Sequence, residues 1–167
     1  QDLYLLSFVL RVLWIEVKHM EINTHYLKTL LSAALNEDCP KGDITSNYFL
    51  KDGVQVQAEI KAKESGVFYG KALIPTMFSL FDDATETQCH VNDGDSLEEG
   101  QKVCTIKGTI KTILLAERVL LNFLQRLSGI STITSQFVKA LDNPAIKILD
   151  TRDRKSTRLN SSHQIIS

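Results

Sequence analysis

The sequence predicts an α+β domain followed by the start of an α/β layer or barrel. Three observations support this: a long apolar stretch with helical spacing over 112–129, shorter alternating stretches before it, and a short apolar run over 145–150. Alternation indicates half-buried strands, and a helix that leads into a buried strand is how an α/β layer or barrel begins. A chain of 167 residues is long enough for one small domain and the beginning of another.

Composition and charge are those of an ordinary soluble globular protein. Hydrophobic residues make up 43% and charged residues 23%, and the net charge of -1 gives no electrostatic case for binding nucleic acid or an acidic membrane surface. Cys39, Cys89 and Cys104 are odd in number and widely spaced, so neither a disulfide framework nor a zinc site is suggested. We therefore expect a cytoplasmic protein without a protein-built metal site.

The first 19 residues are apolar but contain Arg11 and Glu16. This stretch is too short and too charged for a membrane span, and it lacks the basic start and cleavage site of a signal peptide. Met20 follows directly, so we expect residues 1–19 to be translated upstream sequence, with an extra amphipathic helix as the alternative.

Regular elements are expected from residue 20 onward. Apolar spacing predicts a helix over 24–36, capped by Asn23 or Thr24, and a second helix over 72–81 with Pro75 in its first turn. Strands are predicted over 54–62, 66–69, 85–91 and 102–106. The GDITS segment at 42–46 reads as a loop held by side-chain turn bonds.

The stretch over 112–129 is apolar nearly all round, which predicts a helix buried in the core. At about 100° per residue it carries one polar stripe, formed by Arg118, Asn122, Gln125, Arg126 and Gly129. The stripe has two interpretations. It is a solvated face, or Arg118 and Asn122 meet an anionic ligand or a partner subunit.

Ser128 is expected to cap a further helix that ends before Asn143 and Pro144. The apolar run over 145–150 then predicts a buried parallel strand. Thr151 and Arg152 follow at its carboxyl end, where barrels place their active-site residues.

The chain contains five motifs in this order: LNEDCPKGDIT, AKESGVFYG, VNDGDSLEEGQKV, AERVLLNFLQRLSGIST and KILDTR. Together they resemble the quinolinate phosphoribosyltransferase family of decarboxylating nicotinate-nucleotide pyrophosphorylases. The resemblance spans roughly 22–152 and implies an N-terminal sandwich domain over 20–128, including the buried helix 112–128, and a barrel that starts over 129–152. The related ModD-type pyrophosphorylases share much of this pattern and stay an alternative. A non-catalytic interaction module, which keeps the sandwich and the helix, is another.

The resemblance also implies a function. The family joins quinolinate to the ribose of phosphoribosyl pyrophosphate, releasing pyrophosphate and carbon dioxide and giving nicotinate mononucleotide for NAD synthesis, in homodimers or larger assemblies. Arg118 matches an arginine that reaches into the neighbouring subunit's site to hold a quinolinate carboxylate, and Thr151 and Arg152 match residues that contact substrate. Mg²⁺ is expected to arrive with phosphoribosyl pyrophosphate rather than in a protein cage.

The resemblance ends at Arg152. Asp153 stands where the family has a lysine, a reversal of charge beside a site for anions. The DRKSTRLNSSH segment that begins there is the translation of a widely used sequencing adaptor, so we expect residues 153–167 not to be of biological origin. A chain that ends in this way is expected to lack a complete catalytic set and to be inactive. A tail encoded in the genome would instead favour the interaction module.

Overall fold

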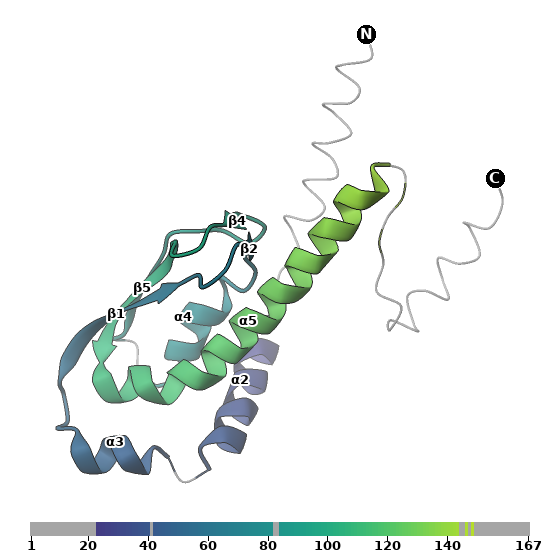
Figure 1. Ribbon diagram of the computed structural model, residues 1–167. Helices are drawn as coiled ribbons and strands as arrows, with labels where there is room; N and C mark the ends of the chain where they lie inside the picture. The colour runs from purple at the N-terminus through teal and green to yellow at the C-terminus, as the bar shows by residue number, and fades with distance from the viewer. Residues whose placement is uncertain (1–22, 41, 82–83, 144–145, 147, 149–167) are drawn as a thin grey trace.

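Helices pack against one face of a small antiparallel sheet in the computed structural model, which describes residues 23–40, 42–81, 84–143, 146 and 148 (Figure 1). Helices α4 and α5 contact the sheet, and α2 packs against both of them. The elements in chain order are α2 (Thr24–Asp38), α3 (Ile44–Phe49), β1 (Gln55–Lys61), β2 (Gly66–Val67), α4 (Leu73–Phe78), β3 (Glu86–Cys89), β4 (Ser96–Leu97), β5 (Lys102–Thr109) and α5 (Ile110–Leu141). This arrangement is an α+β domain, as predicted.

The main sheet has the strand order β1-β5-β3, and β2 pairs with β4 in a separate two-stranded ribbon. All of these pairs are antiparallel. In β1 the exposed and half-buried residues alternate, and the half-buried Val56, Ala58 and Ile60 pack against the core. The predicted strand over 54–62 is therefore confirmed, and its alternation places one face on the helices and the other in solvent.

The core lies between the sheet and the helices. Its largest fully buried side chains come from α2, α4, α5 and β5, and they are Leu31, Ile74, Met77, Phe78, Leu120 and Cys104. Helix α4 is buried on several sides, which explains why a short helix holds so much of the core. Its observed bounds lie inside the predicted helix over 72–81.

Helix α2 begins at Thr24, directly after Asn23, which is one of the two predicted cap residues. The Asn23 side chain accepts a hydrogen bond from the Tyr26 N–H at 3.1 Å, and the helix runs two residues beyond the predicted end at 36. The loop predicted at 42–46 was wrong, because these residues lead into helix α3. The Asp43 side chain accepts from the Ser46 N–H at 3.0 Å, so the expected turn bond serves as a helix cap.

Helix α5 is continuous over 32 residues, so the prediction that a new helix starts at Ser128 was wrong. The Ser128 hydroxyl accepts from the Tyr69 N–H at 3.1 Å and does not cap a helix of its own. One turn further, the Thr132 hydroxyl accepts from the Val67 N–H at 2.9 Å. The two hydroxyls thus bond the backbone at and just after β2. Gly66 permits this approach, since a Cβ there would stand 2.7 Å from Thr132 Oγ1.

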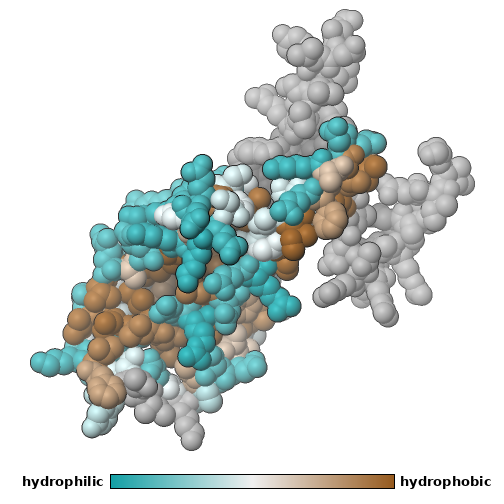
Figure 2. Space-filling view, in the orientation of Figure 1, coloured by the Kyte–Doolittle hydropathy of each residue, from teal (hydrophilic) through white to brown (hydrophobic). Residues whose placement is uncertain are grey.

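The helix over 112–129 was expected to lie in the core with one polar stripe, and the structure buries one face of it and leaves the stripe residues exposed. Only one face is buried, through Ile113, Ala116, Val119, Leu120 and Leu124. Beyond residue 129 the helix exposes apolar side chains, which gather along its C-terminal half in Figure 2: Ile130, Ile133, Phe137, Val138 and Leu141. The predicted domain boundary at 128/129 lies inside this helix, and the division into two domains stays a prediction.

Replacing Thr132 with valine is expected to lower the free energy of unfolding by about 1–3 kcal/mol, because the partly buried Val67 N–H loses its acceptor. Thr134→Val is the matched control. Both hydroxyls donate to the carbonyl four residues earlier, at 2.7 Å for Thr132 and 2.8 Å for Thr134, but Thr134 is exposed and binds no other backbone group among the described residues. Urea unfolding of the two variants checks this, and equal losses would refute a role for the link to β2.

The strand predicted over 145–150 lies outside the described residues except for Ile146 and Ile148, which are exposed and not assigned to a strand. The segments 1–19 and 153–167 also lie outside them. Within the described part of the chain, no helix combines the length and apolar character needed to cross a membrane.

Candidate functional site

Arg118 lies on the exposed face of α5, opposite the C-terminal end of α2. Its Nη1 atom donates to Asp38 Oδ1 at 3.1 Å, and the two residues are separated by 80 positions in the sequence. The Arg118 side chain is 73% exposed, whereas that of Asp38 is 23% exposed. Such a pair in water contributes about 0–1 kcal/mol. It therefore orients the guanidinium but leaves it able to bind another group.

Asp38 stands at an unfavourable place for a carboxylate. It is the last residue of α2, where the helix dipole presents its negative end, and that helix has no basic residue in its last turn. Arg118 supplies the missing positive charge. The Cys39 Sγ lies 3.5 Å from Asp38 Oδ2 and donates to it. Burial, and next this hydrogen bond, raise the pKa of the Cys39 thiol, which keeps the thiol protonated and a donor.

The guanidinium has capacity for a second anion. Asp38 is bonded to one terminal nitrogen, and among the described residues no further hydrogen bond from Arg118 is found. The remaining edge presents two parallel N–H groups, which is the geometry that binds a carboxylate in bidentate fashion. The other members of the predicted stripe, Asn122, Gln125, Arg126 and Gly129, are exposed with it. The stripe is thus one solvent-facing surface, and its ligand stays a prediction.

Thr151 and Arg152 lie outside the described residues, so the structure does not place them relative to Arg118. No group of three or more metal-binding side chains occurs in the part of the chain that the structure describes. The substrate contacts predicted for these two residues stay predictions.

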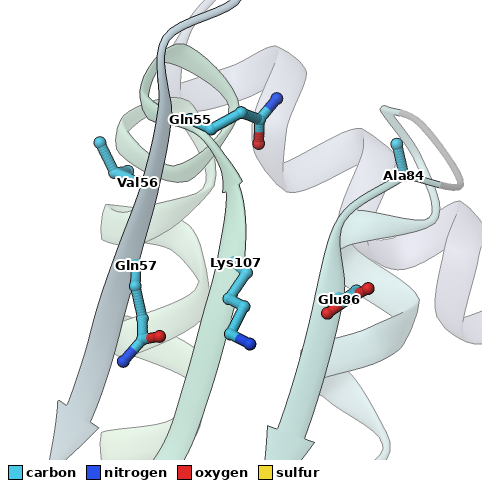
Figure 3. Close-up of a pocket in the computed structure, with 6 residues that line it drawn as sticks. All are labelled: Gln55, Val56, Gln57, Ala84, Glu86 and Lys107. Carbon is cyan, nitrogen blue, oxygen red and sulfur yellow. The ribbon is translucent and has the colours of Figure 1, made fainter.

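A second polar surface lies on the solvent face of the sheet. An open hollow of about 400 Å³ is lined there by Gln55, Val56, Gln57, Ala84, Glu86 and Lys107. Figure 3 shows Gln57 and Lys107 side by side on β1 and β5, with Glu86 on β3, and the register places Lys107 opposite both of the others. One lysine beside one glutamate offers no net positive charge, so this hollow is a poor match for a dicarboxylate or a pyrophosphate.

Sequence reasoning missed Asp38 as the partner of Arg118. The sequence did contain a signal for this pair, because an acidic residue at a helix C-terminus is unfavourable unless a cation lies nearby. What the sequence lacked was a way to choose among its 19 lysine and arginine residues.

Comparison with known proteins identifies relatives for most of the chain. The family model described as quinolinate phosphoribosyl transferase, N-terminal domain, matches residues 43–128. A Bacillus subtilis protein named probable nicotinate-nucleotide pyrophosphorylase (carboxylating) is 42% identical, over 78% of this chain and 45% of its own length. Quinolinate phosphoribosyltransferase (decarboxylating) 2b, mitochondrial, of Nicotiana tabacum is 38% identical, over 85% of this chain and 40% of its own.

The solved structures give the same picture. The crystal structure of NadC from Streptococcus pyogenes superimposes with a TM-score of 0.74 at 37% identity, covering 83% of this chain and 50% of that one. Similarity at this level confirms the predicted fold class. The chain spans less than half the length of the two curated relatives described above.

Proposed function

We propose, on the premise that this chain belongs to the quinolinate phosphoribosyl transferase family, that it is the N-terminal portion of a phosphoribosyltransferase of NAD biosynthesis. The enzyme would join quinolinate to the ribose of phosphoribosyl pyrophosphate and release pyrophosphate, carbon dioxide and nicotinate mononucleotide. The names of the relatives support the reaction class, and a match to the N-terminal domain supports the position of this chain in the whole protein.

The observation that carries the proposal is the exposure of the Arg118 side chain and its hydrogen bonding. An exposed guanidinium, held at one nitrogen by Asp38 and open at its other edge, suits a ligand carboxylate. Asp38 and Arg118 together carry no net charge, so this site alone cannot attract a dianion. Further cations must come from another part of the enzyme. This requirement supports a shared site in a homodimer, in which Arg118 reaches the substrate of the neighbouring subunit.

The remaining parts of the site are proposed from the family resemblance. Thr151 and Arg152 would contact substrate, and Mg²⁺ would enter as part of the phosphoribosyl pyrophosphate complex. Cations placed around the substrate would stabilise the separated charge that develops as pyrophosphate leaves. The proposed compartment is the cytoplasm, which the three free cysteines support.

Arg118→Ala in the full-length enzyme that carries this domain is expected to weaken quinolinate binding about ten- to a hundredfold, the effect of losing a charge-assisted hydrogen bond of about 1.5–3 kcal/mol. Arg126→Ala is the matched control, because Arg126 is exposed on the same face of the same helix. Arg118→Lys should recover only part of the affinity, since an ammonium lacks the planar fork. Titration of quinolinate measures all three, and equal affinities for Arg118→Ala and Arg126→Ala would remove Arg118 from the site.

A further inference from the structure

Two of the three cysteines lie side by side on neighbouring strands. Cys89 on β3 is directly opposite Cys104 on β5, and their sulfur atoms are 3.4 Å apart. The next pair along the ladder, His90 and Val103, is joined by a backbone hydrogen bond of 2.9 Å. The cysteines therefore occupy the non-hydrogen-bonded position of the ladder, where opposite side chains are closest.

The backbone geometry at this position is compatible with a covalent link. Opposite residues in non-hydrogen-bonded pairs have Cα atoms about 4.5 Å apart, and disulfides span Cα separations of about 4.4–6.8 Å. The sulfur atoms must approach from 3.4 Å to a bond length of about 2.0 Å, which is a change that side-chain rotation can supply. Cys39 has no such neighbour, since its thiol donates to Asp38 on another part of the molecule.

The two thiols differ in their access to solvent. Cys89 is only partly buried and ends β3, which is an edge strand of the sheet. Cys104 is fully buried on the central strand. Burial, and next the neighbouring Cys89, raise the pKa of the Cys104 thiol to about 12, so it does not react first with a dissolved reagent. Cys89 is therefore the thiol that reacts with the reagent, and Cys104 needs to reach only the Cys89 sulfur beside it.

We propose that Cys89 and Cys104 form a redox modification site, a dithiol that low-molecular-weight disulfides of the glutathione class convert into an intramolecular disulfide. The site is separate from the chemistry proposed for Arg118 and does not depend on it. The bond would tie the edge strand β3 to the central strand β5 and close a loop over 15 positions of the chain.

The reaction proceeds by two exchanges. The Cys89 thiolate attacks one sulfur of the reagent, the reagent's S–S bond breaks, and one reagent thiolate leaves. The Cys104 thiol then loses its proton, and its sulfur attacks the Cys89 sulfur. The bond from Cys89 to the reagent breaks as the second thiolate leaves. The cysteine sulfurs give up two electrons and two protons in total, and these convert the reagent disulfide into two thiols.

The test treats the folded 167-residue chain with oxidised glutathione without denaturant. Titratable thiols, counted after unfolding, are expected to fall from three to one per chain, and the intact mass by that of two hydrogen atoms. Tryptic cleavage after Lys102 separates the two cysteines, so the new bond should join the peptide VCTIK, residues 103–107, to the peptide that contains Cys89. The oxidised chain should also melt at a higher temperature, and dithiothreitol should reverse this increase.

Variants define the order of the two steps. Cys104→Ser should stop at a mixed disulfide between Cys89 and glutathione, and Cys89→Ser should leave Cys104 reduced. Cys39→Ser is the matched control and should form the bond as the unmodified chain does. Circular dichroism checks that each variant is folded. The unmodified chain decides the question in any case: a thiol count that stays at three, a stable mixed disulfide at Cys89, or a bond to Cys39 would each overturn the proposal.

Discussion

Phe78→Ala is expected to lower the free energy of unfolding by about 3–5 kcal/mol, the range for removing a buried phenylalanine ring. Phe78 is 2% exposed and is the largest of the fully buried side chains. It belongs to α4, which contacts α2, α5 and β3, so the cavity would open where the helices meet the sheet. Since small domains have about 5–15 kcal/mol of stability, this loss would remove a large part of it.

Phe49→Ala removes the same atoms from the surface. Phe49 is 75% exposed, and its recorded ring contact is an edge-to-face pair with Tyr48 at 5.0 Å. The expected loss is at most about 1.5 kcal/mol, the value of an aromatic pair. Urea unfolding of both variants, with the slope of the transition compared, gives the two numbers. A loss at Phe78 no larger than that at Phe49 would mean that α4 does not hold the core as described.

Gly70→Ala is expected to cost about 2–6 kcal/mol, the sum of backbone strain and overpacking. Gly70 has φ of +123°, which L residues rarely adopt. A Cβ there would stand 2.7 Å from Leu124 Cδ2 and 2.9 Å from Leu73 Cδ1, between α5 and α4. The Gly70 N–H also donates to the Asp93 carboxylate at 2.7 Å, which helps to hold the backbone in this position.

Gly94→Ala separates the two causes. Gly94 also has a positive φ, +91°, but a Cβ there would meet nothing within 4 Å. Its substitution should cost only the strain, about 1–3 kcal/mol, and the difference between the two variants is the packing contribution at Gly70. Thermal unfolding of both measures this difference. If Gly94→Ala is as damaging as Gly70→Ala, close packing against α4 and α5 is not the cause.

Local signals in the sequence predicted most elements of the fold. Asn23 caps α2 and alternation marks β1, because each signal involves residues within a few positions of one another. The same local rules failed at Ser128 and at 42–46. Serine and aspartate hydroxyl and carboxylate groups bond whichever N–H lies nearby, and the sequence does not say whether that N–H begins a helix, closes a loop or belongs to another segment.

The candidate site was predicted less completely than the fold. Arg118 was identified by motif and by its place on a polar stripe, and the structure places it in solvent with Asp38 as its partner. Thr151 and Arg152 rest on the motif and on the strand expected before them. The dithiol was not predicted, because 15 positions separate Cys89 from Cys104 and no motif connects them.

The sequence by itself determined the family of this chain, the class of its fold and the region in which its principal helix begins, since these depend on motif order and on periodicity. Tertiary structure alone decided which distant groups meet. Ser128 bonds Tyr69 across 59 positions, Thr132 bonds Val67 across 65, and Arg118 meets Asp38 across 80. The physical reason is that such contacts depend on how whole elements pack. Burial of the apolar faces contributes more free energy to that packing than any single polar pair does.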